Sequence, residues 1–245
     1  MKAFVLAAGL GSRLRPWTLE HPKALVPVGG VPMLERVIVN LRDQGFDRIL
    51  VNVHHFAGQI LDFLDSRDFG VDVSVSDESR LLCDTGGALS HAAWWLACDD
   101  EPFLIHNVDI LSNARLGILM RSHMESDADA TLLVSDRESS RRLLFDNGMS
   151  LAGWMNMETG ALRPEGADID VPACSHFAFS GIHAVSARVV RDIVRRGYPE
   201  SFPIMDYYLS RAGRGSAIRG SLCRDLQLID IGKPESLTRA NRLFV

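Results

Sequence analysis

The chain has 245 residues, 47% of them hydrophobic, which is enough for a substantial core in one large α/β unit or two small ones. Its formal net charge of −5, from 26 basic and 31 acidic residues, argues against nucleic acid as the main partner. No apolar run is long enough to span a bilayer and the opening residues lack a signal-peptide pattern, so we expect a cytoplasmic enzyme or binding protein without a membrane partner.

The first predicted element is an apolar strand over residues 3–7, which runs into a glycine loop at residues 9–12. Arg13, Arg15 and Lys23 follow this loop, and four nearby prolines keep the chain extended or turning. Glycine lets the backbone approach an anion closely, and free N–H groups in such a loop point at it. The stretch therefore indicates a phosphate site, and the alternative is a surface loop with solvated cations.

Two common phosphate motifs do not fit this loop. The dinucleotide fingerprint G-x-G-x-x-G needs a third glycine where Leu14 stands, and Pro16 prevents a helix from starting promptly. The run G-x-x-x-x-G-K-[ST] occurs nowhere in the chain.

Strands and helices alternate after the loop. A helical period begins after Pro32, which suits the first helical position, and ends at Gly45. Strands are predicted at residues 48–53, near 71–75 and at 103–107, with helices between them. This alternation predicts a parallel sheet with right-handed crossovers.

Two polar features stand near the ends of these strands. The run Thr85-Gly86-Gly87 ends a loop and opens a helix, for which Asp84 or Thr85 could simply be the cap. Asp109 follows the strand at 103–107, at the edge where open α/β sheets bind ligands. The alternative for Asp109 is a cap on the helix expected from about residue 114.

The second half has a different character. A strand is predicted at residues 130–134, and turn signals on both sides of residues 151–155 indicate an antiparallel insertion over one end of the main sheet. The strand predicted at 177–185 contains a glycine, Gly181, that also fits a bulge. A last short apolar strand ends at Asp230.

The opening stretch resembles the signature of the sugar-1-phosphate nucleotidyltransferases, L-A-A-G-x-G-[ST]-R-[LM]-x-P-x-T followed by P-K-x-L-x-P-V-x-G-x-P-[ML]. Every fixed position is present between Leu6 and Met33, and residues 230–235 match the closing pattern D-[IVL]-G-[TK]-P-E. The resemblance implies a Rossmann-like three-layer α/β sandwich with a mostly parallel central sheet and a small antiparallel insertion over the sugar side. It also implies a single domain over 1–245, nucleotide-binding to about 110 and sugar-binding from about 111. The absence of hexapeptide repeats predicts no C-terminal β-helix.

The resemblance also implies roles for individual residues. Arg13 and Lys23 are the implied catalytic cations, and Asp109 and Asp230 the implied ligands of Mg²⁺. Ser180 and Gly181 are expected to face the sugar. The implied nucleotide-binding residues are Leu6, Ala7, Ala8, Gly9, Gly11, Ser12, Arg13, Asp77, Glu78, Thr85, Gly86 and Gly87, with either Asp77 or Glu78 serving the base.

The implied reaction joins a nucleoside triphosphate to a sugar-1-phosphate, giving a nucleotide sugar and pyrophosphate, in a monomer or a small homo-oligomer. The Thr85-Gly86-Gly87 loop and the compact chain resemble the N-acetylmuramate-1-phosphate uridylyltransferases and the mannose- or heptose-1-phosphate guanylyltransferases more than the thymidylyl enzymes. Between these two we predict UTP with an N-acetylated hexose-1-phosphate. GTP with mannose- or heptose-1-phosphate is the first alternative. The others are a phosphocholine cytidylyltransferase, which would need an aromatic cage, and a non-catalytic nucleotide-sensing subunit.

Overall fold

The computed structural model describes residues 1–213, 215–232 and 234–243. Lys233, part of the closing motif, lies outside the described residues. Among the described residues, no helix is both long and apolar enough to cross a membrane.

The parallel half of the sheet follows the predicted alternation. At its centre β1 (Lys2–Leu6) pairs in parallel with β4 (Arg48–Val53) and β6 (Phe103–Asn107). β5 (Asp72–Asp77) extends this half beyond β4. The bounds of β4 and β6 are those expected from the sequence, because each is a buried run between polar turns.

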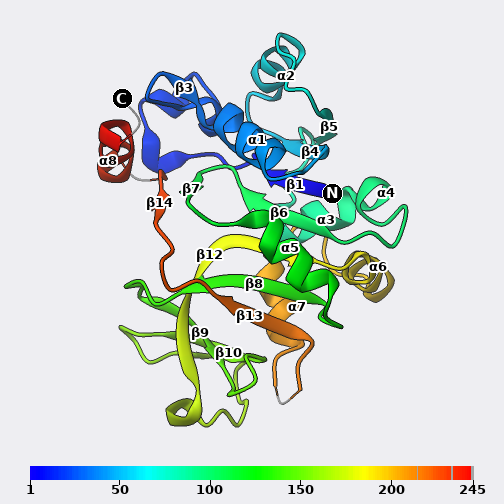
Figure 1. The fold of residues 1–245 in the computed structure, drawn as a ribbon, viewed down its shortest axis with the longest axis vertical. Helices are drawn as coiled ribbons and strands as arrows, with labels where there is room; N and C mark the ends of the chain where they lie inside the picture. Colours follow the sequence, from blue (N-terminus) through cyan, green and yellow to red (C-terminus); the bar gives the residue numbers. More distant parts are fainter. Residues whose placement is uncertain (214, 233, 244–245) are drawn as a thin grey trace.

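The antiparallel half is built on the long strand β12 (Ser175–Val185), which pairs with β6. The strands added around β12 are β8 (Ala130–Ser135), β9 (Arg141–Phe145), β10 (Leu151–Asn156), β11 (Leu162–Arg163) and β13 (Ile218–Leu222). One sheet therefore runs in the order β11-β10-β9-β12-β6-β1-β4-β5, with β8 and β13 joined beside β12. Figure 1 shows β9 and β10 extending away from β1, as expected for an antiparallel insertion over one end.

Helices cover both faces of the sheet, which confirms the three-layer architecture. One face carries α1 (Met33–Asp43), α2 (Ala57–Asp65) and α5 (Leu116–Met124), with α1 and α5 visible in front of the sheet in Figure 1. The other carries α3 (Asp84–His91), α4 (Ala93–Leu96), α6 (Ala187–Arg196) and α7 (Ile204–Ser210). β1 supplies both cores, because Ala3 and Val5 face one layer and Phe4 the other.

Short elements connect these layers. Four are 3₁₀ turns: η1 (Ser12–Leu14), η2 (Trp17–Leu19), η3 (Lys23–Leu25) and η4 (Val171–Ala173). Two are small strand pairs, β2 (Pro27–Val28) with β3 (Val31–Pro32) and β7 (Ile110–Ser112) with β14 (Leu228–Asp230). After β14 the chain forms α8 (Pro234–Leu243), which packs beside β2 and β3.

Two helix starts differ from the sequence expectation. α1 begins at Met33, because Pro32 has an extended ψ of 142° and pairs with Pro27 instead of opening the helix. α5 begins at Leu116, whose N–H donates to Gln44 Oε1 at 2.6 Å. This side chain from the end of α1 satisfies the helix terminus, so Asp109 does not serve as that cap.

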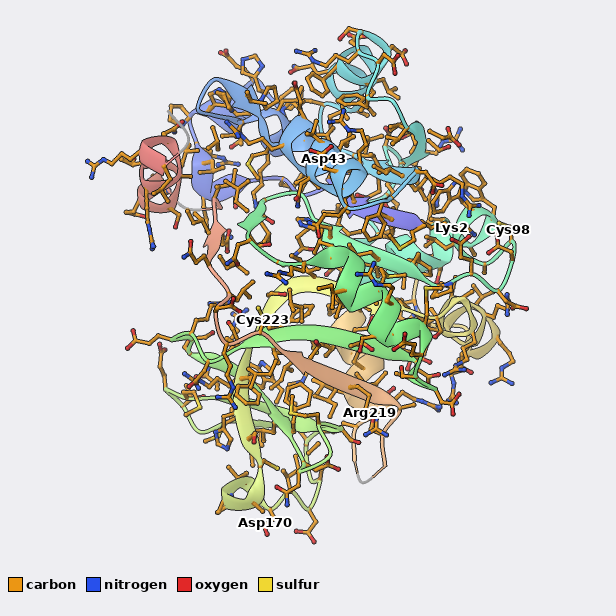
Figure 2. The ribbon with its side chains drawn as sticks, viewed as in Figure 1. Lys2, Asp43, Cys98, Asp170, Arg219 and Cys223 are labelled. Atoms are coloured by element: carbon orange, nitrogen blue, oxygen red, sulfur yellow. The ribbon has the colours of Figure 1, made fainter. Side chains whose placement is uncertain are left out.

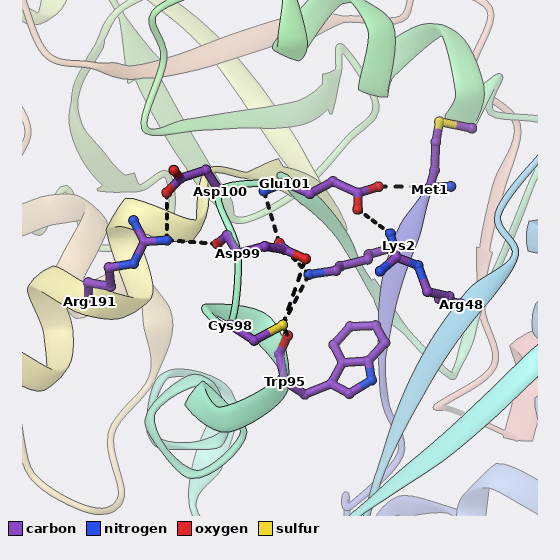
Figure 3. Close-up of polar contacts among 9 residues, drawn as sticks. All are labelled: Met1, Lys2, Arg48, Trp95, Cys98, Asp99, Asp100, Glu101 and Arg191. Carbon is purple, nitrogen blue, oxygen red and sulfur yellow. Dashed lines mark hydrogen bonds and ion pairs between the residues drawn. The ribbon is translucent and has the colours of Figure 1, made fainter.

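The starting edge of the parallel strands is held by a network of charges around Lys2 (Figure 3). Lys2 is 1% exposed, and its Nζ donates to Asp99 Oδ1 at 2.6 Å and lies 5.5 Å from the ring centroid of Trp95. Arg48 and Arg191 extend the network through Glu101 and Asp100. Figure 2 shows Lys2 and Asp170 far apart, so this network lies well away from the tip of the antiparallel half. A buried ammonium needs such a partner, and removing Asp99 would leave it uncompensated.

Three buried histidines predict how stability depends on pH. Burial lowers the pKa of His106 and His123 from 6.5 to about 4, and that of His183 to about 3. The folded pKa is below the unfolded one in each case, so the stability is complete above pH 6.5 and decreases as the pH falls towards 4.

We expect the urea midpoint to fall steadily from about pH 6.5 to about pH 5, each histidine contributing up to about 1.4 kcal/mol per pH unit. His183→Phe should make this fall shallower, because phenylalanine does not titrate. The substitution loses no hydrogen bond, since both ring nitrogens of His183 lack a partner among the described residues. Equal pH slopes for His183→Phe and the wild type would contradict this account.

Candidate functional site

The three central parallel strands end at the same level and together support the glycine loop. Leu6, the last residue of β1, is in register with Asn52 of β4 and Asn107 of β6. The loop leaves β1 between these two amide side chains. The carboxyl edge of the sheet therefore presents polar groups on both sides of the loop, at the position where ligands of open α/β sheets bind.

Asn52 fixes the start of the loop and is a residue that the sequence analysis missed. It is 3% exposed, and its Oδ1 accepts the N–H groups of Ala7 at 2.6 Å and Ala8 at 3.2 Å. Its Nδ2 donates to Glu78 Oε1 at 2.8 Å, and Glu78 Oε2 accepts the Cys83 N–H at 3.3 Å. A lone amide within the apolar strand RILVNV was the available signal.

This arrangement makes Glu78 a buried bridge. Burial raises the pKa of its carboxyl group, against the hydrogen bonds from Asn52 and Cys83 that stabilise the carboxylate. Asp77, its neighbour, is exposed, and the hydrogen bonds from Ser79 lower its pKa. Both line a cavity of about 720 Å³ that also contains Arg80, His91 and Glu200.

The next residues of the loop have free backbone donors. Within the described part of the chain, the N–H groups of Gly9, Leu10 and Gly11 have no acceptor. Gly11 has a φ of +62°, and a Cβ there would lie 2.8 Å from Lys23 Cβ and 2.9 Å from Thr18 Cγ2. Glycine is therefore required at this position both by conformation and by close packing against the Lys23 stem.

Two cations and two carboxylates meet around Gly232. Lys23 Nζ forms an ion pair with Asp109 Oδ2, and the side chains are 12% and 16% exposed. A Cβ on Gly232 would lie 2.7 Å from Arg13 Nη2, 2.8 Å from Asp230 Oδ1 and 3.3 Å from Lys23 Nζ. The four charged residues that the sequence singled out are thus brought together, and Gly232 leaves open the space among three of them.

Asp230 reaches this cluster through the pairing of β14 with β7. Asp230 is in register with Ile110, and the Ile231 N–H donates to the Asp109 carbonyl at 2.9 Å. The Gly232 N–H donates to Asp230 Oδ1 at 2.7 Å, which orients the carboxylate. α8 is fastened nearby, because Asn241 Oδ1 accepts the Gly29 N–H at 2.8 Å.

The donor set fits a magnesium ion. Mg²⁺ usually takes one or two protein carboxylates and completes its shell with water and substrate phosphates. Asp109 and Asp230 supply two such carboxylates from adjacent backbone segments, and the Lys23 ammonium already stands as a cation against one of them. Two is all that this site supplies, since no group of three or more metal-binding side chains gathers anywhere among the described residues.

The Thr85-Gly86-Gly87 run is packed against a distant segment of the chain. The N–H groups of Gly86 and Gly87 donate to the Phe202 carbonyl at 2.8 and 3.2 Å, and Thr85 Oγ1 accepts the Ile204 N–H at 2.9 Å. A Cβ on Gly86 would collide with the Phe202 ring. This packing explains both glycines without a ligand, and their role towards a nucleobase stays a prediction.

Gly181 and Ser180 lie in an irregularity of β12. The register shifts between Phe179 and His183, and Gly181 has a φ of +77°, so the expected bulge is present. A Cβ on Gly181 would lie 2.8 Å from Asn107 Nδ2, two residues before Asp109. Ser180 is 2% exposed and its Oγ accepts the Ile182 N–H at 3.2 Å, so its side chain is engaged within the bulge.

Arg137 is a further cation near this edge that the sequence analysis did not single out. Its Nη2 donates to the Phe179 carbonyl at 2.8 Å, beside the bulge. Burial lowers its pKa, and the charge of Asp230 acts in the opposite direction. Its isolated position in the sequence gave no pattern that would have marked it.

A sequence model of the family described as "Nucleotidyl transferase" matches residues 2–143. The N-acetylmuramate alpha-1-phosphate uridylyltransferase of Neisseria meningitidis serogroup B is 29% identical over 214 residues, covering 80% of this chain and 84% of that protein. The probable mannose-1-phosphate guanylyltransferase 1 of Oryza sativa subsp. japonica is 34% identical over 140 residues, covering 55% of this chain. That stretch spans only 38% of the rice protein, well under two thirds of its length.

The fold also resembles that of solved structures. HddC from Yersinia pseudotuberculosis superimposes with a TM-score of 0.77 at 22% identity, covering 100% of this chain and 99% of that one. A likeness at this identity concerns the fold, and it agrees with the layered sheet described above.

The buried hydrogen bonds that Asn52 makes to Ala7, Ala8 and Glu78 predict a large loss of stability in Asn52→Leu. Leucine would leave the Ala7 and Ala8 N–H groups and one Glu78 oxygen buried without partners. At roughly 1–3 kcal/mol for each unsatisfied group, we expect a loss of at least about 3 kcal/mol, measured by urea unfolding. Asn147→Leu in an exposed turn is the control and should change stability by less than about 0.5 kcal/mol. Similar losses in the two variants would contradict the stabilising role that we assign to the Asn52 hydrogen bonds.

Proposed function

Because the chain belongs to the Nucleotidyl transferase family, we propose that it transfers a nucleotidyl group from a nucleoside triphosphate to a sugar-1-phosphate, releasing pyrophosphate. The observation that carries the proposal is the meeting of Arg13, Lys23, Asp109 and Asp230 around Gly232, beside a loop with free N–H donors. In this proposal the cations and the loop bind phosphate, and the two carboxylates bind the metal that accompanies it.

The acceptor needs no general base. A phosphate monoester at pH 7 is largely a dianion, because its second pKa is about 6, so one of its oxygens is already a nucleophile. The barrier comes from charge, since one anion must attack the α-phosphorus of another. Catalysis is therefore a matter of positioning and of neutralising charge.

The chain's own residues divide this work. The free N–H groups of Gly9, Leu10 and Gly11 and the Arg13 guanidinium bind the β- and γ-phosphates, which leave as pyrophosphate. Lys23 neutralises charge at the α-phosphate as the acceptor oxygen bonds to phosphorus and the bridging oxygen departs. Asp109 and Asp230 would hold Mg²⁺, which when bound would supply further positive charge to the phosphate oxygens.

The acceptor lies on the side of β12. Gly181 permits the close approach of the Asn107 amide, since a Cβ there would lie 2.8 Å from Asn107 Nδ2, and the sugar phosphate is proposed to bind beside this amide. Arg137, fastened to the Phe179 carbonyl, adds a positive charge at this edge. We treat 1–245 as one nucleotidyltransferase unit, with the nucleotide held mainly by residues up to about 110 and the sugar mainly by those from about 111.

UTP with an N-acetylated hexose-1-phosphate is the substrate pair we favour. The support is the Neisseria relative named N-acetylmuramate alpha-1-phosphate uridylyltransferase, which aligns over most of both chains. GTP with mannose-1-phosphate is the second candidate, from the rice relative that aligns over the first part of the chain. Uracil and guanine differ in their hydrogen-bonding edges, so a pocket suited to one leaves polar groups unpaired with the other.

Two other functions have less support. A choline site needs an exposed aromatic cage. Tyr207 and Tyr208 are 1% and 0% exposed and belong to the core. Trp154, Phe177 and Phe179 are partly buried against that core, so a cage would have to be built from these three. A sensing subunit that had lost catalysis would lack one of the charged groups, whereas Arg13, Lys23, Asp109 and Asp230 are all in place.

Asp109→Asn tests the charge cluster. Asparagine keeps the shape but removes a charge from the metal site and from the Lys23 pair, so pyrophosphate release should fall by at least about 100-fold. Asp129→Asn is the matched control, because Asp129 is 15% exposed and paired with Arg188 away from the site. Both variants should retain the wild-type circular dichroism spectrum. Near-normal release by a folded Asp109→Asn protein would refute the assigned role.

The substrate pair is tested with four nucleoside triphosphates against a panel of sugar-1-phosphates and phosphocholine. With Mg²⁺ present, we expect the fastest pyrophosphate release from UTP and an N-acetylated hexose-1-phosphate, by at least about tenfold over guanine nucleotides. A preference for GTP would overturn the nucleotide assignment and keep the reaction class. Release with phosphocholine alone would overturn the sugar, and no release with any pair would favour the sensing subunit.

A further inference from the structure

The free protein already places a cation where the metal is expected. Lys23 Nζ contacts Asp109 Oδ2 directly, and both side chains are largely buried at 12% and 16% exposure. The Lys23 stem is held against Gly11, where a Cβ would lie only 2.8 Å from Lys23 Cβ. The stem is thus anchored, and in the free protein the ammonium at its end is the partner of the carboxylate.

The second carboxylate is bordered by a cation as well. One point, the position that a Cβ would take on Gly232, lies 2.7 Å from Arg13 Nη2, 2.8 Å from Asp230 Oδ1 and 3.3 Å from Lys23 Nζ. The four side chains carry two formal positive and two formal negative charges, so the cluster is neutral before any ligand binds. A divalent cation entering this cluster would meet two positive charges at close range.

We propose that the Lys23 ammonium is a placeholder for the divalent cation, so that the Lys23–Asp109 pair and metal binding at Asp109 exclude each other. The inference rests on the proposed function and adds an order of events to it. The triphosphate binds first and draws Lys23 and Arg13 to its oxygens. As Lys23 leaves, Asp109 and Asp230 become available to the divalent cation, which replaces the ammonium as the partner of Asp109.

Two physical arguments support this order. A partly buried carboxylate without a partner is unfavourable, so Asp109 needs a cation in every state of the protein. Lys23 is a flexible point charge that can transfer from a carboxylate to a phosphate without losing an ionic partner. The coupling is reciprocal, so a bound metal must in turn strengthen the hold of Lys23 on phosphate.

The test measures metal binding without turnover. Free Mn²⁺, an oxygen-binding substitute for Mg²⁺, is counted by electron paramagnetic resonance during titration of the full chain in the absence of nucleotide. Lys23→Met should bind Mn²⁺ about tenfold more tightly than the wild type, within the roughly 5–150-fold range of coupled ligands. Lys23→Gln is a second variant, should the methionine perturb folding.

Two controls isolate the pair from general electrostatics. Arg15→Met removes one positive charge from the same exposed loop and should leave Mn²⁺ affinity within about twofold of the wild type. In an Asp109→Asn background, Lys23→Met should no longer tighten Mn²⁺ binding, because the carboxylate that it frees is absent. A tightening of equal size in both backgrounds would overturn the proposal, as would equal affinities of the wild type, Lys23→Met and Lys23→Gln.

The failure of this proposal is separable from that of the proposed function. Tightened Mn²⁺ binding in Lys23→Met with no pyrophosphate release from the wild type would uphold the placeholder and reject the reaction. Normal release from the wild type with unchanged Mn²⁺ binding in both Lys23 variants would do the reverse.

Discussion

The ion pair between Lys23 and Asp109 joins three parts of the chain that are distant in sequence. Lys23 belongs to the proline-rich stretch after the glycine loop, Asp109 follows β6, and the Asp109 carbonyl holds the N–H of Ile231 after β14. Lys23 and Asp109 therefore link the proline-rich stretch, the carboxyl edge of the sheet and the C-terminal segment, and a change in the partner of Lys23 would alter a contact that all three share. The glycines at positions 11 and 232 are the spaces that permit this close approach.

The two ends of the parallel strands have different tasks. At the starting edge, Lys2 is buried with Asp99 as a permanent partner, and the surrounding charges are paired with one another. At the carboxyl edge, the side chain of Asn52 satisfies Ala7 and Ala8, while the following N–H groups stay free. In these two places the fold uses satisfied polar contacts for support at the starting edge and leaves backbone donors free at the carboxyl edge, where an anion can reach them.

The sequence predicted the strands of the parallel half and the edge at which Asp109 lies, because buried apolar runs and the turns that end them are local signals. β4 and β6 have the predicted bounds, and Asp109 lies at the expected edge. What it could not supply were contacts that depend on distant segments. Three such contacts join residues whose separation in the sequence follows no helical or strand periodicity. They are the packing of Gly86 against Phe202, the hydrogen bond from the Leu116 N–H at the start of α5 to Gln44, and the hydrogen bond between Asn52 and Glu78. Asp77 or Glu78 was expected to serve the base; the Glu78 carboxylate is buried and accepts hydrogen bonds from Asn52 and Cys83, and the role of either residue towards a base stays a prediction.

The pairing of β7 with β14 has a consequence for how such chains can diversify. The two strands clasp the ends of one long excursion of the chain, from Ser112 to Leu228, that includes the whole antiparallel half. Insertions or deletions within a closed excursion change its closure entropy only slowly and leave its ends where they are. If the proposed function holds, the acceptor side between the two aspartates could be lengthened, shortened or re-lined without moving either of them, and related chains could then differ in the sugar while keeping the same phosphate chemistry.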